Sequence, residues 1–331
     1  MSLDVVRQVL ALAENYLSAH PGEAIECLWH GGEPLLLGPA YYRRVWELQQ
    51  ALGPAVRARI HHGLQTNLTC LDEEFIPILK LMGITAIGTS FDPEPHVRGG
   101  GPDRDSDAFS RRFLQALSLL ERHGFSWSLT YVVARHSLAD PMGVFHFLAN
   151  LGPTAGLTLN PVLTMSGGRV AAGLAPEEYV GFLGAIFPYW FERRARFQGV
   201  EPFASMMRGI ETDTLGPEAM AFGVCDTRRN RLAIGPDGSV RPGGWASGSP
   251  ERVLGTIEEM SLDDVFARPE REEARRELAQ RRAEACGTCR LERACRGTAA
   301  TPVVPDSWCR ARVRFVEEVL EPVTGRRVDH V

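Results

Sequence analysis

The first 200 residues alternate between short apolar runs and longer amphipathic segments, and this alternation limits the fold more than any other feature. Strands alternating with helices of ten or more residues predict βαβ units and a mostly parallel sheet. Too few strands are present for a closed eight-stranded barrel. We therefore expect an α/β fold built on a partial (β/α) barrel. The predicted strands cover residues 24–29, 59–66, 84–91, 126–134 and 156–163, and the predicted helices cover residues 3–19, 39–52, 72–82, 107–123, 140–150 and 176–197.

From about residue 222 the pattern changes. A hairpin with a Pro-Asp-Gly turn is predicted over residues 230–241, followed by a charged helical stretch over 261–283 and a final helix over about 310–320. Cysteines are also concentrated in this part of the chain. We therefore expect two domains: a partial barrel over residues 1–221 and a small cysteine-rich domain over residues 222–331.

Four cysteines lie close together near the end of the chain: Cys286, Cys289, Cys295 and Cys309. Two cysteines separated by two residues can reach one metal from a single tight turn, and four thiolates suit either zinc or an iron–sulfur cluster. The alternative is four unrelated reduced thiols. The spacing favours one metal centre at these four residues and leaves the identity of the metal open.

The remaining composition excludes several classes of function. The net charge of −5 argues against a nucleic-acid-binding protein, and no apolar run is long enough to span a membrane. The N-terminal segment reads as an amphipathic helix and lacks the basic region and apolar core of a signal peptide. We therefore expect a cytoplasmic chain with reduced thiols, in which clustered cysteines bind metal.

Polar and glycine-rich segments follow the predicted strands. Gly31, Gly32 and Glu33 follow the first strand, Asn67 follows the second, and Ser90 and Asp92 end the third. Since ligands of parallel α/β sheets bind at the carboxyl ends of the strands, these residues should line one face. There, the Glu33 carboxylate could accept hydrogen bonds from an ammonium group, and the Asp92 carboxylate from ribose hydroxyls.

These segments resemble the radical S-adenosylmethionine (SAM) enzymes that carry a SPASM auxiliary-cluster domain. Residues 29–36 (WHGGEPLL) resemble the family's H-x-GGEP-L loop, and residues 64–67 (LQTN) resemble the start of its Q-T-N-G-x-L-L-D segment. The resemblance implies a radical SAM-type barrel, a SPASM-like C-terminal domain, and a peptide or protein substrate, as in anaerobic sulfatase maturases. Residues 88–92 (GTSFD), followed by His96 and Arg98, resemble the family's S-x-D-G…H-D-x-x-R segment. The resemblance also implies a SAM site, made of Gly31, Gly32, Glu33, Asn67, Ser90, Asp92 and Arg98.

The sequence departs from the family pattern in two places. The family binds its radical-generating cluster through C-x3-C-x2-C, but this sequence contains no such run, and Cys27 stands alone. Gly243 and Ala299 occupy two positions at which the SPASM pattern has cysteines. Both losses fall on one auxiliary site. The resemblance therefore implies a single auxiliary [4Fe–4S] cluster at the four C-terminal cysteines, with zinc as the alternative.

Two functions remain as hypotheses, and the sequence leaves enzymatic activity undecided. One is a radical SAM/SPASM-like maturase homologue whose radical chemistry requires the cluster motif from a segment beyond this sequence. The other is a non-catalytic relative, a pseudoenzyme that binds a peptide or pairs with an active radical SAM enzyme. Polar SAM chemistry such as methyl transfer is less favoured because no base is evident. His61 and His62 lie in the second strand, where one of them must point inward, and that one is interpreted as a structural core or rim histidine.

Overall fold

The computed structural model describes most of the chain. The described residues are 1–95, 97–99, 105–166, 169–212, 231–242, 253–269, 273, 276, 280, 283–284, 286–291 and 306–328. Within them, no helix combines the length and the apolar character that crossing a membrane requires.

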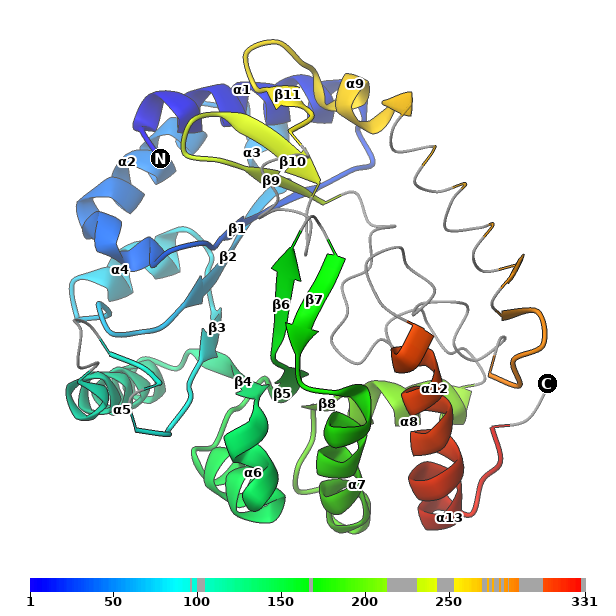
Figure 1. Ribbon diagram of the computed structural model, residues 1–331. Helices are drawn as coiled ribbons and strands as arrows, with labels where there is room; N and C mark the ends of the chain where they lie inside the picture. Colours follow the sequence, from blue (N-terminus) through cyan, green and yellow to red (C-terminus); the bar gives the residue numbers. More distant parts are fainter. Residues whose placement is uncertain are drawn as a thin grey trace.

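A six-stranded parallel sheet forms the centre of the molecule, with strand order β1-β2-β3-β4-β5-β8. The sheet curves, and helices lie along its outer side, giving a partial (β/α) barrel as the sequence predicts (Figure 1). A two-stranded antiparallel hairpin, β6–β7, follows β5. The strands are β1 (Ile25–Trp29), β2 (Ile60–Thr66), β3 (Ala86–Ser90), β4 (Ser126–Val133), β5 (Gly156–Pro161), β6 (Leu163–Ser166), β7 (Arg169–Gly173) and β8 (Val200–Glu201).

The helices follow the periodicity of the sequence. In α1, Ser2 caps the N-terminus by accepting a hydrogen bond from the Val5 amide, and apolar residues recur at helical spacing on the buried side. In α5, Asp105 accepts from the Ala108 amide in the same way. The helices of the barrel are α1 (Leu3–Ala19), α2 (Gly38–Gln50), α3 (Pro54–Arg57), α4 (Phe75–Leu81), α5 (Ser106–Arg122), α6 (Pro141–Asn150), α7 (Pro176–Glu192) and α8 (Phe203–Thr212).

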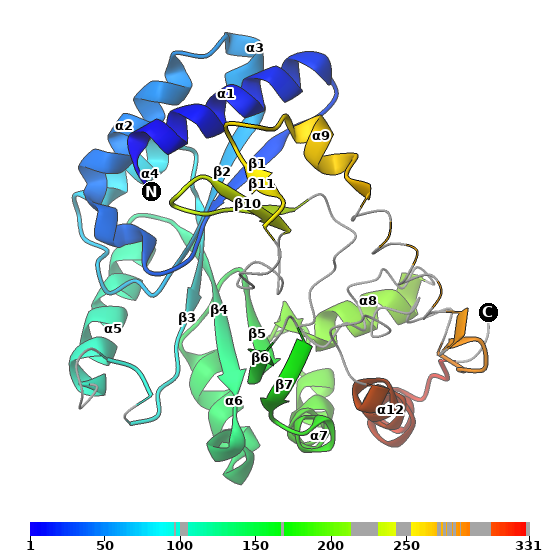
Figure 2. The ribbon, with the colours of Figure 1, turned by 45° about the horizontal axis from the view of Figure 1, so that its top comes forward.

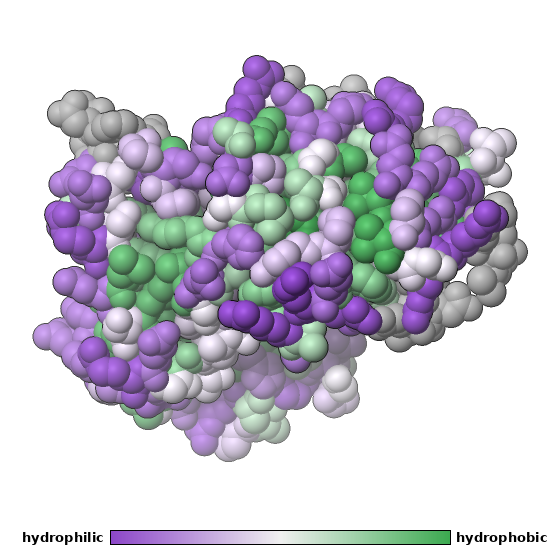
Figure 3. All heavy atoms as spheres, turned by 90° about the horizontal axis from the view of Figure 1, so that it is seen from below, coloured by the Kyte–Doolittle hydropathy of each residue, from purple (hydrophilic) through white to green (hydrophobic). Residues whose placement is uncertain are grey.

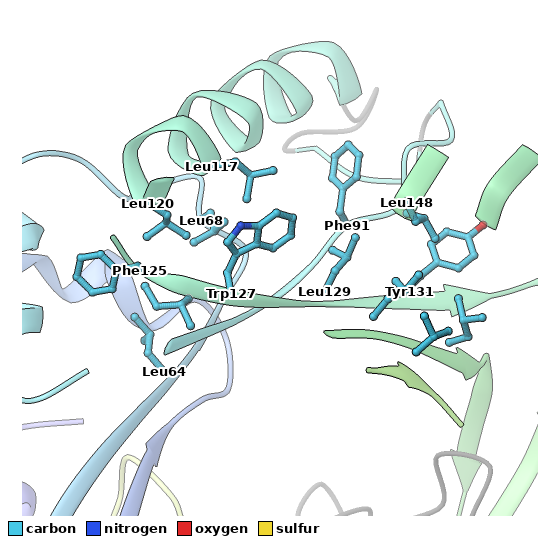
Figure 4. Close-up of a cluster of buried hydrophobic side chains, with 14 of the residues drawn as sticks. Leu64, Leu68, Phe91, Leu117, Leu120, Phe125, Trp127, Leu129, Tyr131 and Leu148 are labelled. Carbon is cyan, nitrogen blue, oxygen red and sulfur yellow. The ribbon is translucent and has the colours of Figure 1, made fainter. Parts of the chain in front are cut away.

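Strand alternation divides the sheet into a helix-facing side and a concave side. On β4 every second residue is buried, and Trp127, Leu129 and Tyr131 point toward the side where Leu117 and Leu120 of α5 lie (Figure 4). The apolar core therefore lies between the sheet and its helices. The opposite side of each strand faces inward and is available to line a site.

A second, smaller core joins the C-terminal region to the barrel. The three-stranded sheet β11-β10-β9 packs with α9 against α1, through a cluster of Val240, Ile257, Met260 and Val265. Figure 2 shows this small sheet beside α1. The boundary predicted at residues 221/222 lies outside the described residues and stays a prediction. The elements are β9 (Leu232–Ile234), β10 (Ser239–Pro242), β11 (Gly255–Thr256) and α9 (Leu262–Phe266).

The last helical segment returns to the barrel. It consists of α12 (Asp306–Phe315), the π-helical η5 (Val316–Leu320) and α13 (Glu321–Thr324), and α12 packs on α7. Phe187 of α7 meets Phe315 edge to face, with ring centroids 5.6 Å apart. Seen from below, the surface is mainly hydrophilic with hydrophobic residues gathered in separate areas (Figure 3).

The structure differs from the sequence-based expectation in detail. The expected five strands are joined in the sheet by β8, which is only two residues long and carries no periodicity to detect. The hairpin β6–β7 was also not predicted. The helix expected from Asp72 begins at Phe75, because the Asp72 carboxylate accepts a hydrogen bond from the Glu74 amide and forms a turn first.

Candidate functional site

The Gly-Gly-Glu loop follows β1 directly. Gly31 and Gly32 both have positive φ, at 85° and 54°, a conformation that side chains other than glycine rarely adopt. Both glycines are exposed, so the backbone of the loop is open to a ligand. Glu33 then caps the short helix η1 (Pro34–Leu37), because its Oε1 accepts a hydrogen bond from the Leu35 amide at 3.0 Å.

The Glu33 carboxylate also joins the ends of β1 and β2. Its Oε1 accepts a hydrogen bond from the Thr66 hydroxyl at 2.5 Å, and its Oε2 accepts one from the Asn67 amide at 2.8 Å. With the bond from Leu35, three donors approach this carboxylate. Since a carboxylate offers about four acceptor positions, room remains for a further donor such as an ammonium group. The structure thus brings Glu33 and Asn67 together.

The turn after β2 contains a feature that sequence reasoning missed. Leu68 has φ of 66°, and among the described residues it is the only one other than glycine with a positive φ. The similar family segment has glycine at this position. Here the turn is supported by the Leu68 amide, which donates to the Thr66 hydroxyl at 3.0 Å, and by the fully buried Leu68 side chain. The backbone at the end of β2 is therefore strained, and packing holds it in place.

A second group of predicted residues meets at the end of β3. Arg98 Nε donates to Asp92 Oδ2 at 2.6 Å, and Arg98 Nη2 donates to the Ser90 hydroxyl at 3.1 Å. The Asp92 side chain is 9% exposed and the Arg98 side chain 26% exposed, so the pair is shielded from water. The remaining N–H groups of the Arg98 guanidinium can still donate to an anionic group such as a carboxylate. Ser90, Asp92 and Arg98 thus form one cluster.

Small and polar residues cover the concave side of the central strands. Gly88 leaves space for its neighbour, because a Cβ atom there would lie 2.0 Å from Gln65 Oε1. At the end of β5, the buried Oδ1 atom of Asn160 has no hydrogen-bond partner. This concave face therefore offers hydrogen-bonding groups and little apolar bulk. Its residues in this part of the sheet are Gln65, Gly88, Ser90, Ser128, Thr130, Thr158 and Asn160.

His62 is a structural histidine, as interpreted from the sequence. Gln49 Nε2 donates to two backbone carbonyls, so Gln49 Oε1 must accept from His62 Nε2 at 2.6 Å. His62 Nδ1 then accepts from Trp29 Nε1 at 3.2 Å. Burial lowers the pKa of His62 to about 4, with a smaller contribution from His61. The neutral ring is therefore locked between α2 and β1, while His61 is exposed.

The lone Cys27 is also structural. It lies in β1 and packs against the main core, and burial raises the pKa of its thiol to about 11. A thiol with so high a pKa remains protonated at neutral pH, as expected for a cysteine that serves to fill the core.

The cysteine module is the segment from Cys286 to Cys309, and its described part contains one tight turn. The Cys289 amide donates to the Cys286 carbonyl at 2.9 Å, which places both cysteines on the same turn, and Cys286 is buried. Cys309 lies in α12, while Cys295 falls outside the described residues. Among the residues that the structure describes, no three His, Cys, Asp or Glu side chains are grouped closely enough to hold a metal ion. The four-cysteine site therefore stays a prediction.

The chain folds as a partial (β/α) barrel of the radical SAM type. The rim of this barrel, at the carboxyl ends of β1, β2 and β3, is formed by Glu33, Asn67, Ser90, Asp92 and Arg98. Residues 225–290 match the SPASM family, an iron-sulfur cluster-binding domain. The serine-type anaerobic sulfatase-maturating enzyme of Klebsiella aerogenes is 27% identical over 183 residues, covering 54% of this chain and 44% of that enzyme. The cysteine-type enzyme of Clostridium perfringens is 24% identical over 277 residues, covering 81% of this chain and 72% of that enzyme.

Solved structures show the same fold. A structure of native anSMEcpe with bound AdoMet and Cp18Cys peptide has a TM-score of 0.77 and 20% identity, covering 98% of this chain and 90% of that one. Streptococcus suis SuiB bound to S-adenosylmethionine has a TM-score of 0.55 and 14% identity, covering 89% of this chain and 65% of that one. Together with the SPASM match and the relatives, these structures support a radical SAM/SPASM maturase family for this chain. The prediction made from the motifs is thereby confirmed.

Proposed function

We propose that this chain is a radical SAM/SPASM-like homologue of peptide- or protein-modifying maturases, and that its rim binds SAM. One observation carries the proposal. The residues predicted from three separate segments form two ordered clusters at the carboxyl edge of one sheet, Glu33 with Asn67 and Arg98 with Asp92. A general α/β fold does not require this arrangement. The Klebsiella enzyme aligns over less than half of its length, so the whole enzyme's activity is part of the proposal.

Each cluster suits a different part of SAM. Glu33 retains acceptor capacity for the ammonium group beside the open backbone of Gly31 and Gly32, and Arg98 retains N–H groups for the carboxylate. Asp92, held by Arg98 and by the Val132 amide at 3.3 Å, lies where it could also accept from ribose hydroxyls. In the family, bound SAM supplies a radical once a separate cluster reduces it. The residues described here bind and orient the cofactor.

The four C-terminal cysteines are proposed to hold one auxiliary [4Fe–4S] cluster. The turn from Cys286 to Cys289, the soft thiolate donors and the SPASM match support this proposal. The cluster would sit apart from the rim and serve a structural or electron-relaying role. Zinc at the same thiolates is the alternative.

Metal analysis after anaerobic purification tests the cluster. We expect four irons and four sulfides per chain by the stoichiometry of a [4Fe–4S] centre, and their loss in Cys289→Ala. Cys70→Ala is the matched control, because Cys70 lies on the barrel at the turn after β2 and should leave the iron content unchanged. One zinc and no iron per chain would refute the iron–sulfur assignment.

Calorimetry with S-adenosylhomocysteine tests the SAM site. S-adenosylhomocysteine retains the ammonium, carboxylate and ribose of SAM, so the rim should bind it. Loss of this binding in Arg98→Met but not in Arg111→Met, on the exposed surface of α5, would support the assigned cluster. If the wild-type chain binds neither SAM nor S-adenosylhomocysteine, the proposed SAM site is refuted, and the rim residues serve only the fold.

The second candidate is a pseudoenzyme, a peptide-binding or partner subunit of an active radical SAM enzyme. The replacements Gly243 and Ala299 at SPASM cysteine positions favour it. The upstream coding sequence distinguishes the two candidates. An in-frame C-x3-C-x2-C segment there supports the maturase, and an in-frame stop supports the subunit.

A further inference from the structure

Beside the Asp92–Arg98 pair lies a third group of polar side chains with no role assigned so far. Glu94, two residues after Asp92, accepts a hydrogen bond through Oε1 from the hydroxyl of Tyr131 on β4. His136 Nε2 lies 3.4 Å from the same oxygen. The Tyr131 hydroxyl in turn lies 2.8 Å from the Ser137 hydroxyl in η2 (Arg135–Ala139).

The donor and the acceptor of each hydrogen bond in this network can be assigned. Ser137 Oγ accepts from the Ala134 amide at 3.0 Å, so its own proton is free for the Tyr131 oxygen. The Tyr131 proton is then the one donated to Glu94. The chain of donors runs from Ala134 through Ser137 and Tyr131 to the carboxylate, and such aligned hydrogen bonds strengthen one another.

The anchor end of the network is rigid. Tyr131 is fully buried, and Ser137 is 1% exposed. Tyr131 stands on the helix-facing side of β4 among apolar side chains, and so has little freedom to move (Figure 4). The carboxylate of Glu94, which belongs to a loop, is thus tied to the most ordered part of the sheet.

The loop end of the network lies next to the proposed cofactor cluster. The Glu94 carbonyl accepts from the Val97 amide at 3.3 Å, which closes a turn immediately before Arg98. The Arg98 carbonyl also accepts from the Ser106 hydroxyl at 2.6 Å, at the start of α5. An ordered Glu94 therefore restrains the backbone that precedes Arg98, and the hydrogen bond from Ser106 restrains the Arg98 carbonyl.

We infer that Glu94 and Tyr131 are positioning residues that hold Arg98 in register with Ser90 and Asp92 for the carboxylate of SAM. This inference rests on the proposed SAM site and adds two residues to it. When the tie to β4 is broken, the loop samples positions in which Arg98 is misplaced, and the apparent affinity falls with the population of the competent loop.

Tyr131→Phe tests the inference, with Tyr179→Phe as the matched control. Both tyrosines are fully buried, and the Tyr179 hydroxyl donates to the Leu159 carbonyl at 2.6 Å on the neighbouring strand. Each variant loses one buried hydroxyl, so both should lower the melting temperature. Calorimetry should show roughly tenfold weaker S-adenosylhomocysteine binding in Tyr131→Phe and unchanged binding in Tyr179→Phe.

A second pair of variants separates positioning from general destabilisation. Glu94→Gln keeps a carbonyl acceptor for the Tyr131 hydroxyl and should retain wild-type affinity, whereas Glu94→Leu should bind as weakly as Tyr131→Phe. Equal affinities in Tyr131→Phe and wild type would overturn the inference and leave the SAM site standing. A wild-type chain that binds no S-adenosylhomocysteine would overturn both.

Discussion

The rim of the barrel and the cysteine module are organised by different interactions. At the rim, Glu33 receives three hydrogen bonds from the protein and Asp92 is paired with Arg98. In the module, the Cys289 amide donates to the Cys286 carbonyl, and the four thiols are proposed to meet at one metal. A site for an organic cofactor can be prepared by hydrogen bonds, while a thiolate site is commonly completed by the metal itself. The rim should therefore persist without ligand, and the module should depend on its metal.

Removing the proposed metal should produce the largest difference in hydrogen-exchange protection between the two regions. Anaerobic chelation, or Cys289→Ala, should expose the amides around residues 286–291 to hydrogen exchange by orders of magnitude, because metal binding and local folding are one equilibrium. The amides of Leu35 and Asn67, which donate to Glu33, should keep their protection. Equal loss of protection in both regions would show that the rim also depends on the metal.

Removing the Glu33 carboxylate should damage the rim and spare the module. Glu33→Leu leaves the Leu35, Thr66 and Asn67 donors without their acceptor, and we expect a loss of about 3 kcal/mol of unfolding free energy. S-adenosylhomocysteine binding should disappear, while the metal content stays unchanged. Chemical denaturation and metal analysis measure the two effects.

Glu47→Leu is the control for this variant. Glu47 forms an exposed pair with Arg44 on α2, and its loss should cost less than about 0.5 kcal/mol. If Glu33→Leu is no more destabilised than this control, the hydrogen bonds at the rim do not organise the site.

The meeting of the rim residues could be predicted from the sequence for a physical reason, whereas the four-cysteine site lies partly outside the described residues and stays a prediction. Strand alternation and the parallel α/β pattern determine which residues reach the carboxyl edge, so Glu33, Asn67, Ser90 and Asp92 could be placed together. Arg98 was assigned only through the resemblance, because nothing in its local sequence shows that it folds back onto Asp92. The network from Ser137 to Glu94 was missed, since it joins residues of a strand, a short helix and a loop that have no common spacing.

Two local features of the barrel escaped prediction for similar reasons. The positive φ of Leu68 has no signature in a leucine, because contacts with residues distant in the sequence impose it. The strand β8 spans two residues, too few for a period to appear. The identity of the metal proposed for the four cysteines could not be chosen from their spacing, because thiolates bind zinc and iron–sulfur clusters alike.

The stability of the β1–β2 region should depend on pH through His62. The pKa of His62 falls from 6.5 to about 4 in the folded chain, so between these values the unfolded chain binds more protons. The stabilisation is fully present above pH 6.5 and is lost as the pH falls toward 4, with a total of about 3 kcal/mol. Denaturation measured from pH 7 to pH 4 should show this slope.

His62→Gln should flatten the slope in that window. The carboxyls with lowered pKa, such as Asp237 and Asp264, titrate below their usual range and so act at more acidic pH. An unchanged slope in His62→Gln would mean that His62 is accessible to protons in the folded chain, in contrast to its buried position between Trp29 and Gln49.

The smallest expected effect is the difference in stability between two variants of the strained turn that carries Asn67. Leu68→Ala and Leu68→Gly both remove a fully buried side chain, and both should destabilise the chain through the cavity by roughly 2–5 kcal/mol. At φ of 66°, however, alanine keeps the steric strain that glycine relieves. Leu68→Gly should therefore be more stable than Leu68→Ala by about 1 kcal/mol, the reverse of the usual order.

The difference between these two variants isolates the backbone from the cavity, because the cavity is nearly the same in both. If alanine proves the more stable, the turn relaxes to negative φ once the leucine is gone, and the strain is a consequence of packing Leu68 beneath the sheet. If glycine is the more stable, the left-handed turn is required by the bonds from Thr66 and Asn67 to Glu33. The rim then sets the backbone, and the leucine side chain only supports it.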